Sequence, residues 1–216
     1  MKQQGLLKSF SGIVIVLAWL AILPVSCTQT PRIHQETIVL IRHGEKPSGG
    51  LGQLTCKGLN RALALPALLI GRYGKPDFIF APNPSVQVND HSSHGYSYVR
   101  PLATIEPTAI SLGLPVDAQI AFDRIDLLQQ SLLQPAFEDS KIFVAWEHIK
   151  LRDFAVEMLK QYGTAHVDVP DWPNSDYETI YVFHIKRSDQ GAPQATLEIQ
   201  QEGLSNSLSD ACPGPK

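Results

Sequence analysis

The chain has 216 residues, of which 44% are hydrophobic and 18% are charged, and its formal net charge is −3. This length and composition predict one domain with a substantial hydrophobic core. No stripe of basic residues runs along the chain, which argues against nucleic acid as a partner.

The N-terminal segment, residues 1–27, is typical of an export signal. Lys2 and Lys8 give it a positive start, and residues 12–25 form an uncharged, mostly apolar run. This run is shorter than the roughly 20 residues that a membrane-spanning helix needs, and small and polar residues follow it, as at a cleavage site. We therefore expect a bacterial protein exported to the periplasm, with an uncleaved membrane anchor as the alternative.

Cys27 lies where a bacterial lipoprotein carries its lipidated cysteine. The segment 23–27 resembles a lipobox, although Pro24 stands where that pattern has leucine. Two outcomes stay open: a lipoprotein anchored to the membrane through Cys27, and a cleaved periplasmic form without the anchor.

Two cysteines remain after the signal, Cys56 and Cys212. In an exported chain such a pair predicts one disulfide. This bond would tie the C-terminal end of the chain to the loop after the first strand, and closing so long a loop contributes on the order of 4 kcal/mol to stability.

A polar linker, residues 28–35, precedes the single domain that we expect over residues 36–216. The domain opens with residues 37–41, an apolar run rich in β-branched side chains, which is typical of a strand buried on both faces of a parallel sheet. Four further strands are predicted from apolar runs at residues 77–80, 141–146, 179–185 and 195–200.

Helices are predicted between these strands, at residues 58–73, 104–112, 123–133 and 151–162. Pro66 should kink or shorten the first helix, and Pro107 suggests that the second begins later than residue 104. Strands that alternate with helices predict an α/β fold: a three-layer sandwich with a mostly parallel central sheet flanked by helices.

Two histidines directly follow buried strands. His43 comes after the first strand and Arg42, and His148 comes after the strand at residues 141–146. The carboxyl ends of parallel strands meet at one sheet edge, where open α/β sheets bind ligands. Together with Arg100 these residues predict an anion pocket, because guanidinium groups bind phosphate oxygens in pairs and a histidine can attack phosphorus. The pattern alone does not decide which histidine attacks.

The segment Arg42-His43-Gly44-Glu45 resembles the signature of the histidine phosphatase superfamily, which includes the cofactor-dependent phosphoglycerate mutases. Further segments resemble that family in the same order along the chain: residues 54–62, Arg100 with residues 108–114, and residues 144–148. The resemblance implies a phosphoglycerate mutase-like fold and His43 as the phosphorylated nucleophile. Arg42, Arg100 and His148 would complete the phosphate pocket, and no metal or organic cofactor would take part.

The chain departs from the family's pattern around the second arginine. A loop at residues 81–98, without apolar periodicity, separates the second strand from Arg100. Arg124 is therefore the alternative second arginine. The same loop carries His91 and His94, but no third ligand accompanies them, so we predict no metal site.

Three acids compete for the role of proton donor to the leaving oxygen. Asp123 lies in the interval where the family carries this carboxylate, and Asp126 is second. Glu147 competes from outside that interval, because it directly precedes His148, where the family usually has a small residue.

The sequence thus predicts an exported phosphatase that hydrolyses a small phosphomonoester, or an anhydride, through a phosphohistidine on His43. Two alternatives stay open: a phosphomutase of the same fold and a non-catalytic anion-binding lipoprotein. We expect the loops at residues 81–98 and 168–176 to select the substrate.

Overall fold

The computed structural model describes residues 31–90, 93–166, 168–188 and 191–214. The expected export signal and Cys27 lie outside these residues, and so does His91. Residues Pro31–Lys216 cluster as one compact unit. Among the described helices, none combines the length and the apolar character that crossing a bilayer requires.

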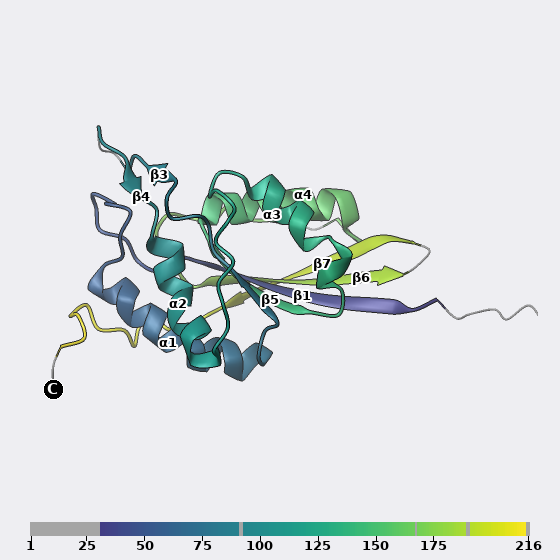
Figure 1. The fold of residues 1–216 in the computed structure, drawn as a ribbon, viewed down its shortest axis with the longest axis horizontal. Coiled ribbons are helices and arrows are strands. Elements are labelled where there is room, and N and C mark those ends of the chain that lie inside the picture. Colours follow the sequence, from purple (N-terminus) through teal and green to yellow (C-terminus); the bar gives the residue numbers. More distant parts are fainter. Residues whose placement is uncertain (1–30, 91–92, 167, 189–190, 215–216) are drawn as a thin grey trace, which may run out of the picture. The chain divides into compact units, whose positions relative to one another are not determined.

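A five-stranded sheet forms the centre of this unit (Figure 1). Its strands lie in the order β2-β5-β1-β6-β7. Strands β2, β5 and β1 are parallel, whereas β6 and β7 are antiparallel to their neighbours. The sheet is therefore mixed: β6 runs antiparallel to β1 on one side and to β7 on the other. The bounds of the strands are Ile33–Arg42 (β1), Phe78–Phe80 (β2), Lys141–Trp146 (β5), Thr179–Ser188 (β6) and Gly191–Gln201 (β7).

Helices cover both faces of the sheet, with α1 and α2 on one face and α3 and α4 on the other (Figure 1). Alternate residues of β1 point to opposite faces of the sheet. Val39 packs in the core under α1 and α2, and Leu40 packs in the core under α3 and α4. This arrangement confirms the predicted α/β three-layer sandwich. The helices are Cys56–Tyr73 (α1), Arg100–Leu112 (α2), Ile125–Leu132 (α3) and His148–Tyr162 (α4), with a 3₁₀ turn at Pro135–Phe137.

The two prolines do not limit the helices as the sequence suggested. α1 continues through Pro66, and α2 begins at Arg100, ahead of the predicted residue 104, with Pro107 inside it. Pro101 fits the first turn of α2, where a missing N–H leaves no hydrogen bond unmade. Both helices bury an apolar face against the sheet, and this burial offsets the single backbone hydrogen bond that an interior proline removes.

The first strand begins earlier than expected. The predicted linker reached residue 35, but β1 starts at Ile33 and pairs with β6 from there onward. Glu36 is buried and forms an ion pair with Arg187 of β6. Residues 33–35 are paired with residues 186–188 at the end of β6. The linker prediction was therefore wrong for residues 33–35.

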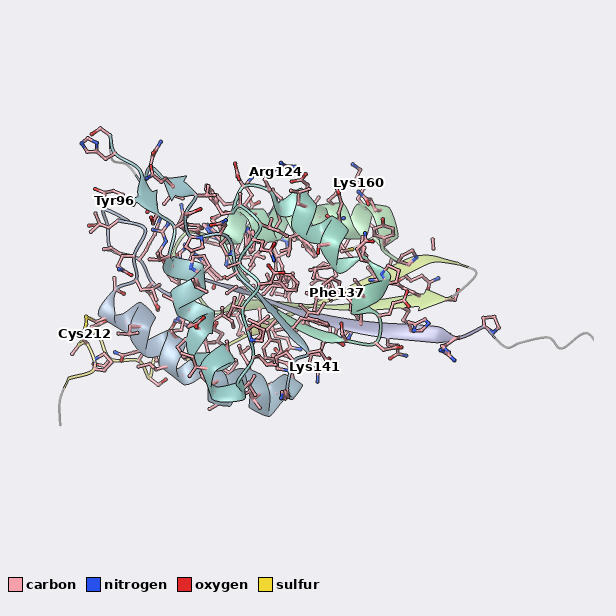
Figure 2. The ribbon with its side chains drawn as sticks, viewed as in Figure 1. Tyr96, Arg124, Phe137, Lys141, Lys160 and Cys212 are labelled. Carbon is pink, nitrogen blue, oxygen red and sulfur yellow. A yellow bond between two sulfur atoms is a disulfide. The ribbon has the colours of Figure 1, made fainter. Side chains whose placement is uncertain are left out.

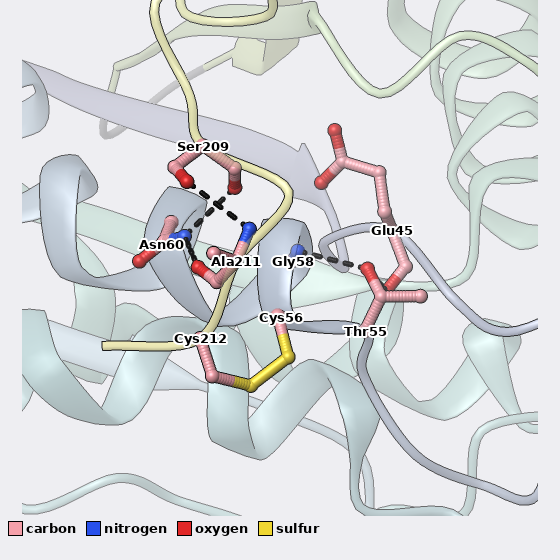
Figure 3. The surroundings of a disulfide bond; sticks show 8 residues. All are labelled: Glu45, Thr55, Cys56, Gly58, Asn60, Ser209, Ala211 and Cys212. Atoms are coloured by element: carbon pink, nitrogen blue, oxygen red, sulfur yellow. Dashed lines mark hydrogen bonds between the residues drawn. A yellow bond between two sulfur atoms is a disulfide. The ribbon is translucent and has the colours of Figure 1, made fainter. Parts of the chain in front are cut away.

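The predicted disulfide between Cys56 and Cys212 is confirmed (Figure 3). It links the first residue of α1 to the C-terminal segment, 156 residues further along the chain. The side-chain nitrogen of Asn60 donates to the carbonyl oxygens of Ser209 and Ala211, both at 2.8 Å. The covalent bond and these hydrogen bonds hold the C-terminal segment against the start of α1.

Candidate active site

A pocket of about 340 Å³ lies at the carboxyl edge of the parallel strands, and the four residues predicted to bind phosphate all line it. They are Arg42, His43, Arg100 and His148. All four side chains are buried. The backbone N–H of His43 donates to the carbonyl of Trp146 at 3.0 Å, so β1 and β5 end side by side and deliver both histidines to one place.

His43 is held as a neutral imidazole with one nitrogen left for chemistry. Its Nδ1 lies 2.7 Å from the carbonyl oxygen of Gly44. A carbonyl can only accept, so Nδ1 carries the proton and Nε2 keeps its lone pair. Burial, and after it the charges of Arg100 and Arg42, hold the pKa of His43 well below its usual value. Nε2 is therefore an unprotonated nitrogen at neutral pH.

Arg42 is tethered at one end of its guanidinium group. Nη1 donates to the carbonyl oxygens of Asn174 and Asp176, at 2.9 and 2.6 Å, and to that of Pro173 at 3.3 Å. The ring of Tyr177 stacks on the group, with its centroid 3.9 Å from Cζ. Nε and Nη2 are buried, and no described residue accepts a hydrogen bond from either.

The guanidinium group of Arg100 is also hydrogen-bonded at some of its nitrogens and, within the described chain, unpaired at another. Its Nη1 and Nη2 donate to the carboxylate of Asp90, with Nη2 3.1 Å from Oδ1. Nη1 also lies 3.2 Å from the carbonyl oxygen of Gly50. Nε is buried without an acceptor in the described ranges, and the same holds for the hydroxyl of Tyr98 beside it.

Glu147 lies against His148, with Oε1 2.6 Å from Nδ1. Its Oε2 accepts from the backbone N–H of Lys150 at 2.9 Å, so Glu147 also caps the N-terminus of α4. Burial raises the pKa of Glu147, but His148 and the backbone amides of Lys150 and Ile149 outweigh it and bring the pKa to about 2. Glu147 is therefore ionised at neutral pH and carries no proton to give to a leaving group.

The other candidates for proton donor and second arginine lie outside the pocket. Asp123 is exposed, and of the described residues near it only Phe122 lines the pocket. Arg124 and Asp126 pair with each other at 2.9 Å at the exposed start of α3. Figure 2 labels Arg124. The backbone turns at residues 122–123, where the N–H of Arg124 donates to the carbonyl of Ala121 at 3.0 Å. The carbonyl of Phe122 accepts from the indole of Trp146 at 2.8 Å. The structure thus brings Arg100 into the pocket and leaves Asp123, Arg124 and Asp126 out.

Sequence reasoning missed Asp90 and Lys46, which also line the pocket. Lys46 Nζ lies 3.9 Å from Asp90 Oδ1. The role of Asp90 has no signature in the sequence, because it depends on the arginine that Asp90 meets in space. Within the described ranges, no group of three or more metal-ligating side chains is found.

Together the fold and the pocket define an α/β protein with two buried arginines and two buried histidines in a pocket at the carboxyl edge of its sheet. Neither a family model nor a curated relative matches the chain. Among solved structures, the mycobacterial glucosyl-3-phosphoglycerate phosphatase is 13% identical with a TM-score of 0.47, covering 76% of this chain and 97% of its own. SixA from Nakamurella multipartitia, provisionally described as a phosphohistidine phosphatase, is 16% identical with a TM-score of 0.47, covering 77% of this chain and 95% of its own.

A third solved structure is a mutant phosphoserine phosphatase from Entamoeba histolytica in complex with phosphoserine. It is 13% identical with a TM-score of 0.45, and the match covers 80% of this chain and 100% of that one.

Proposed function

We propose that this protein is an exported phosphatase that hydrolyses phosphomonoesters through a phosphohistidine on His43. The observation that carries the proposal is a set of buried donors with no acceptor in the described chain: Nε and Nη2 of Arg42, Nε of Arg100 and the hydroxyl of Tyr98. Buried donors are almost always satisfied in proteins. A tetrahedral oxyanion beside His43 would accept from all of them at once.

In the first step, Nε2 of His43 attacks phosphorus and the bond from phosphorus to the ester oxygen breaks. The unprotonated nitrogen suits this role, because it needs no base to remove a proton before it attacks. Arg42 and Arg100 neutralise the charge on the equatorial oxygens, which is where most of the catalytic effect of such a pocket arises.

The departing oxygen needs a proton when the alcohol is a poor leaving group. None of the three predicted carboxylates fits this role, because Asp123 and Asp126 are exposed and Glu147 is ionised. We assign it to His148, whose Nδ1 faces the Glu147 carboxylate and whose Nε2 is the remaining ring nitrogen. In the second step water attacks the phosphohistidine, the bond from phosphorus to nitrogen breaks, and His148 takes the proton of the water.

Export is part of the proposal. Residues 1–27 have the pattern of an export signal. The disulfide between Cys56 and Cys212 supports an oxidising compartment, where such bonds persist. The pocket volume of about 340 Å³ suits a small phosphorylated substrate.

The test is hydrolysis of an aryl phosphate by the protein from Thr28 onward, which contains the compact unit Pro31–Lys216. His43→Ala should lower kcat/KM by roughly a thousandfold or more, because the nucleophile is lost. His166→Ala, a change at an exposed histidine, is the matched control and should retain activity. Equal activity in wild type and His43→Ala would refute the proposal, and phosphoryl transfer to an added alcohol without release of phosphate would favour a phosphomutase.

A further inference from the structure

A carboxylate sits inside this cationic pocket. Asp90 belongs to the 81–98 segment, which forms a small hairpin from β3, Gln87–Val88, and β4, Tyr96–Ser97. The Asp90 side chain is 8% exposed, and its Oδ2 accepts from the backbone N–H of Gly52 at 3.0 Å. A carboxylate beside a phosphate site opposes phosphate binding by charge repulsion, unless a cation already neutralises it.

The guanidinium group of Arg100 has two edges that can each bind a pair of oxygens. Asp90 takes the end formed by Nη1 and Nη2. The other edge consists of Nε and the second N–H of Nη2. Nε is buried, and it lacks an acceptor in the part of the chain that the structure describes. Asp90 and a phosphate can therefore bind Arg100 together, on different edges.

Arg42 repeats this division with a different tether. Backbone carbonyls hold its Nη1, and its Nε and Nη2 find no acceptor among the described residues. Arg42 is thus fixed through Nη1 and Arg100 through both Nη1 and Nη2, and each keeps Nε available. At Arg42 neutral carbonyls do the fixing, and at Arg100 a carboxylate does it.

Asp90 is itself held by close packing against the glycine-rich loop after β1, residues 48–52. A Cβ added at Gly50 would lie 2.3 Å from Cβ of Asp90, and one added at Gly52 would lie 2.1 Å from the carbonyl oxygen of Ser97. Both glycines have positive φ angles, which other residues adopt at a cost. The 81–98 hairpin therefore packs closely against the glycine-rich loop, and this packing limits where the Asp90 carboxylate can lie.

We propose that Asp90 is a positioning residue: it grips Arg100 by its Nη1–Nη2 end and so presents the Nε edge to the phosphoryl group. This inference rests on the proposed function, because it assigns Arg100 to phosphate. The 81–98 hairpin thus contributes to the phosphate pocket, because its Asp90 holds Arg100 in place. Apart from Asp90, the Gly50 carbonyl is the hydrogen-bond acceptor that the structure gives the Arg100 guanidinium group in the described chain.

Two other roles for Asp90 make different predictions. As a competing anion it would occupy the donors that phosphate needs, yet Nε of Arg100 lies outside its reach. As a proton donor it would have to be protonated. Burial raises its pKa, but Arg100, the Gly52 amide and Lys46 outweigh burial and leave the pKa below its usual value.

The experiment compares wild type with Asp90→Asn in two measurements: calorimetric binding of inorganic phosphate, and hydrolysis of two aryl phosphates with a good and a poor leaving group. We expect phosphate binding to weaken and KM to rise, each roughly tenfold, because the oriented charged hydrogen bond is lost. The loss in kcat/KM should be the same for both leaving groups. Asp126→Asn is the matched control. It makes the same change in an aspartate–arginine pair, with Arg124, that is exposed and lies outside the pocket.

A double-mutant cycle separates positioning from a general effect on the fold. Once Arg100 is replaced by alanine, adding Asp90→Asn should weaken phosphate binding no further, because Asp90 acts through Arg100 alone. Additive losses would overturn the proposal. So would tighter phosphate binding in Asp90→Asn, which indicates a competing anion, or a loss confined to the poor leaving group, which indicates a proton donor.

If Asp90→Asn does not fold, Asp90→Glu takes its place, since it keeps the charge and shifts the carboxylate; unchanged phosphate binding in that variant would overturn the proposal. Phosphate binding is read without turnover. A protein that binds phosphate but hydrolyses nothing would therefore contradict the proposed function and still test the role of Asp90.

Discussion

Oε1 of Glu147 lies 2.6 Å from Nδ1 of His148, and Oε2 of the same carboxylate caps the helix that His148 begins. One side chain thus contacts both the imidazole of His148 and the N-terminus of its helix. The carboxylate stays ionised because its pKa is about 2. His148 is therefore fixed with Nδ1 turned to a negative charge, and Nε2 remains for a substrate.

Glu147→Gln should lower kcat by roughly ten- to a hundredfold for an alkyl phosphate and less for an aryl phosphate with a good leaving group, because the amide no longer supports an imidazolium at His148. The measurement is kcat for both substrates at neutral pH. Glu157→Gln, an exposed change on the same helix, is the control. An equal loss for both substrates would contradict proton donation by His148.

The low pKa of His43 predicts that this imidazole does not titrate around its usual value. Burial and the two arginines disfavour its protonated form. We expect the side-chain nitrogen shifts of His43 in NMR spectra to stay those of a neutral ring protonated at Nδ1 between about pH 8 and about pH 5.5. A midpoint near about 6.5 would show that the pocket does not hold His43 neutral.

A second buried charge cluster should govern stability at high pH. Arg61 donates to Glu45 at 2.8 and 3.0 Å and to Glu178 at 2.6 Å, and it also pairs with Glu202. Burial raises the pKa of Glu202 to about 8, although Arg61 opposes the shift. Three carboxylates around one guanidinium group leave the most buried one protonated at neutral pH.

Because the folded pKa of Glu202 lies above the unfolded value of 4.5, the protonated group contributes stability that is complete below the unfolded pKa and is lost as pH rises through about 8. Glu202→Gln imitates the protonated form. Its Tm should therefore rise relative to wild type as the pH increases from about 5 to about 9. Glu198→Gln, at an exposed site on β7, should show no such trend; a Tm difference that does not change with pH would contradict this role.

Replacing both Cys56 and Cys212 by serine should lower the free energy of unfolding by about 4 kcal/mol, because the unfolded chain loses a long closed loop. Urea denaturation measures the loss, and wild type treated with a reductant should match the double variant. Well below the Tm the variant should keep its kcat, because neither sulfur lines the pocket among the described residues. Unchanged denaturation would mean that the bond does not constrain the unfolded state.

The sequence was sufficient for the elements whose apolar side chains fill the core. The runs at residues 37–41 and 141–146 became β1 and β5, and with them came His43 and His148 at adjacent strand ends. The two strands could be predicted because burial on both faces leaves a strong pattern in the sequence. Arg42 and Arg100 line the same pocket, and the resemblance to the histidine phosphatase superfamily had marked them.

The parts that escaped prediction depend on contacts between distant segments. The β3–β4 hairpin has strands of two residues, too short for any periodicity, and the glycine-rich loop determines where Asp90 lies. The ionised state of Glu147 follows from His148 and two backbone amides, none of which a residue type reveals. Asp123 had the expected place in the chain, but the turn after Phe122 carries it to the surface.

The most direct test of the central claim is to trap the phosphorylated enzyme. The protein is mixed with a phosphate ester, quenched in alkali, where phosphohistidine survives, and digested for tandem mass spectrometry. We predict one phosphoryl group, on His43, which is absent in His43→Ala. A phosphoryl group on His148, or steady hydrolysis with no phosphorylated peptide at any quench time, would contradict nucleophilic attack by His43.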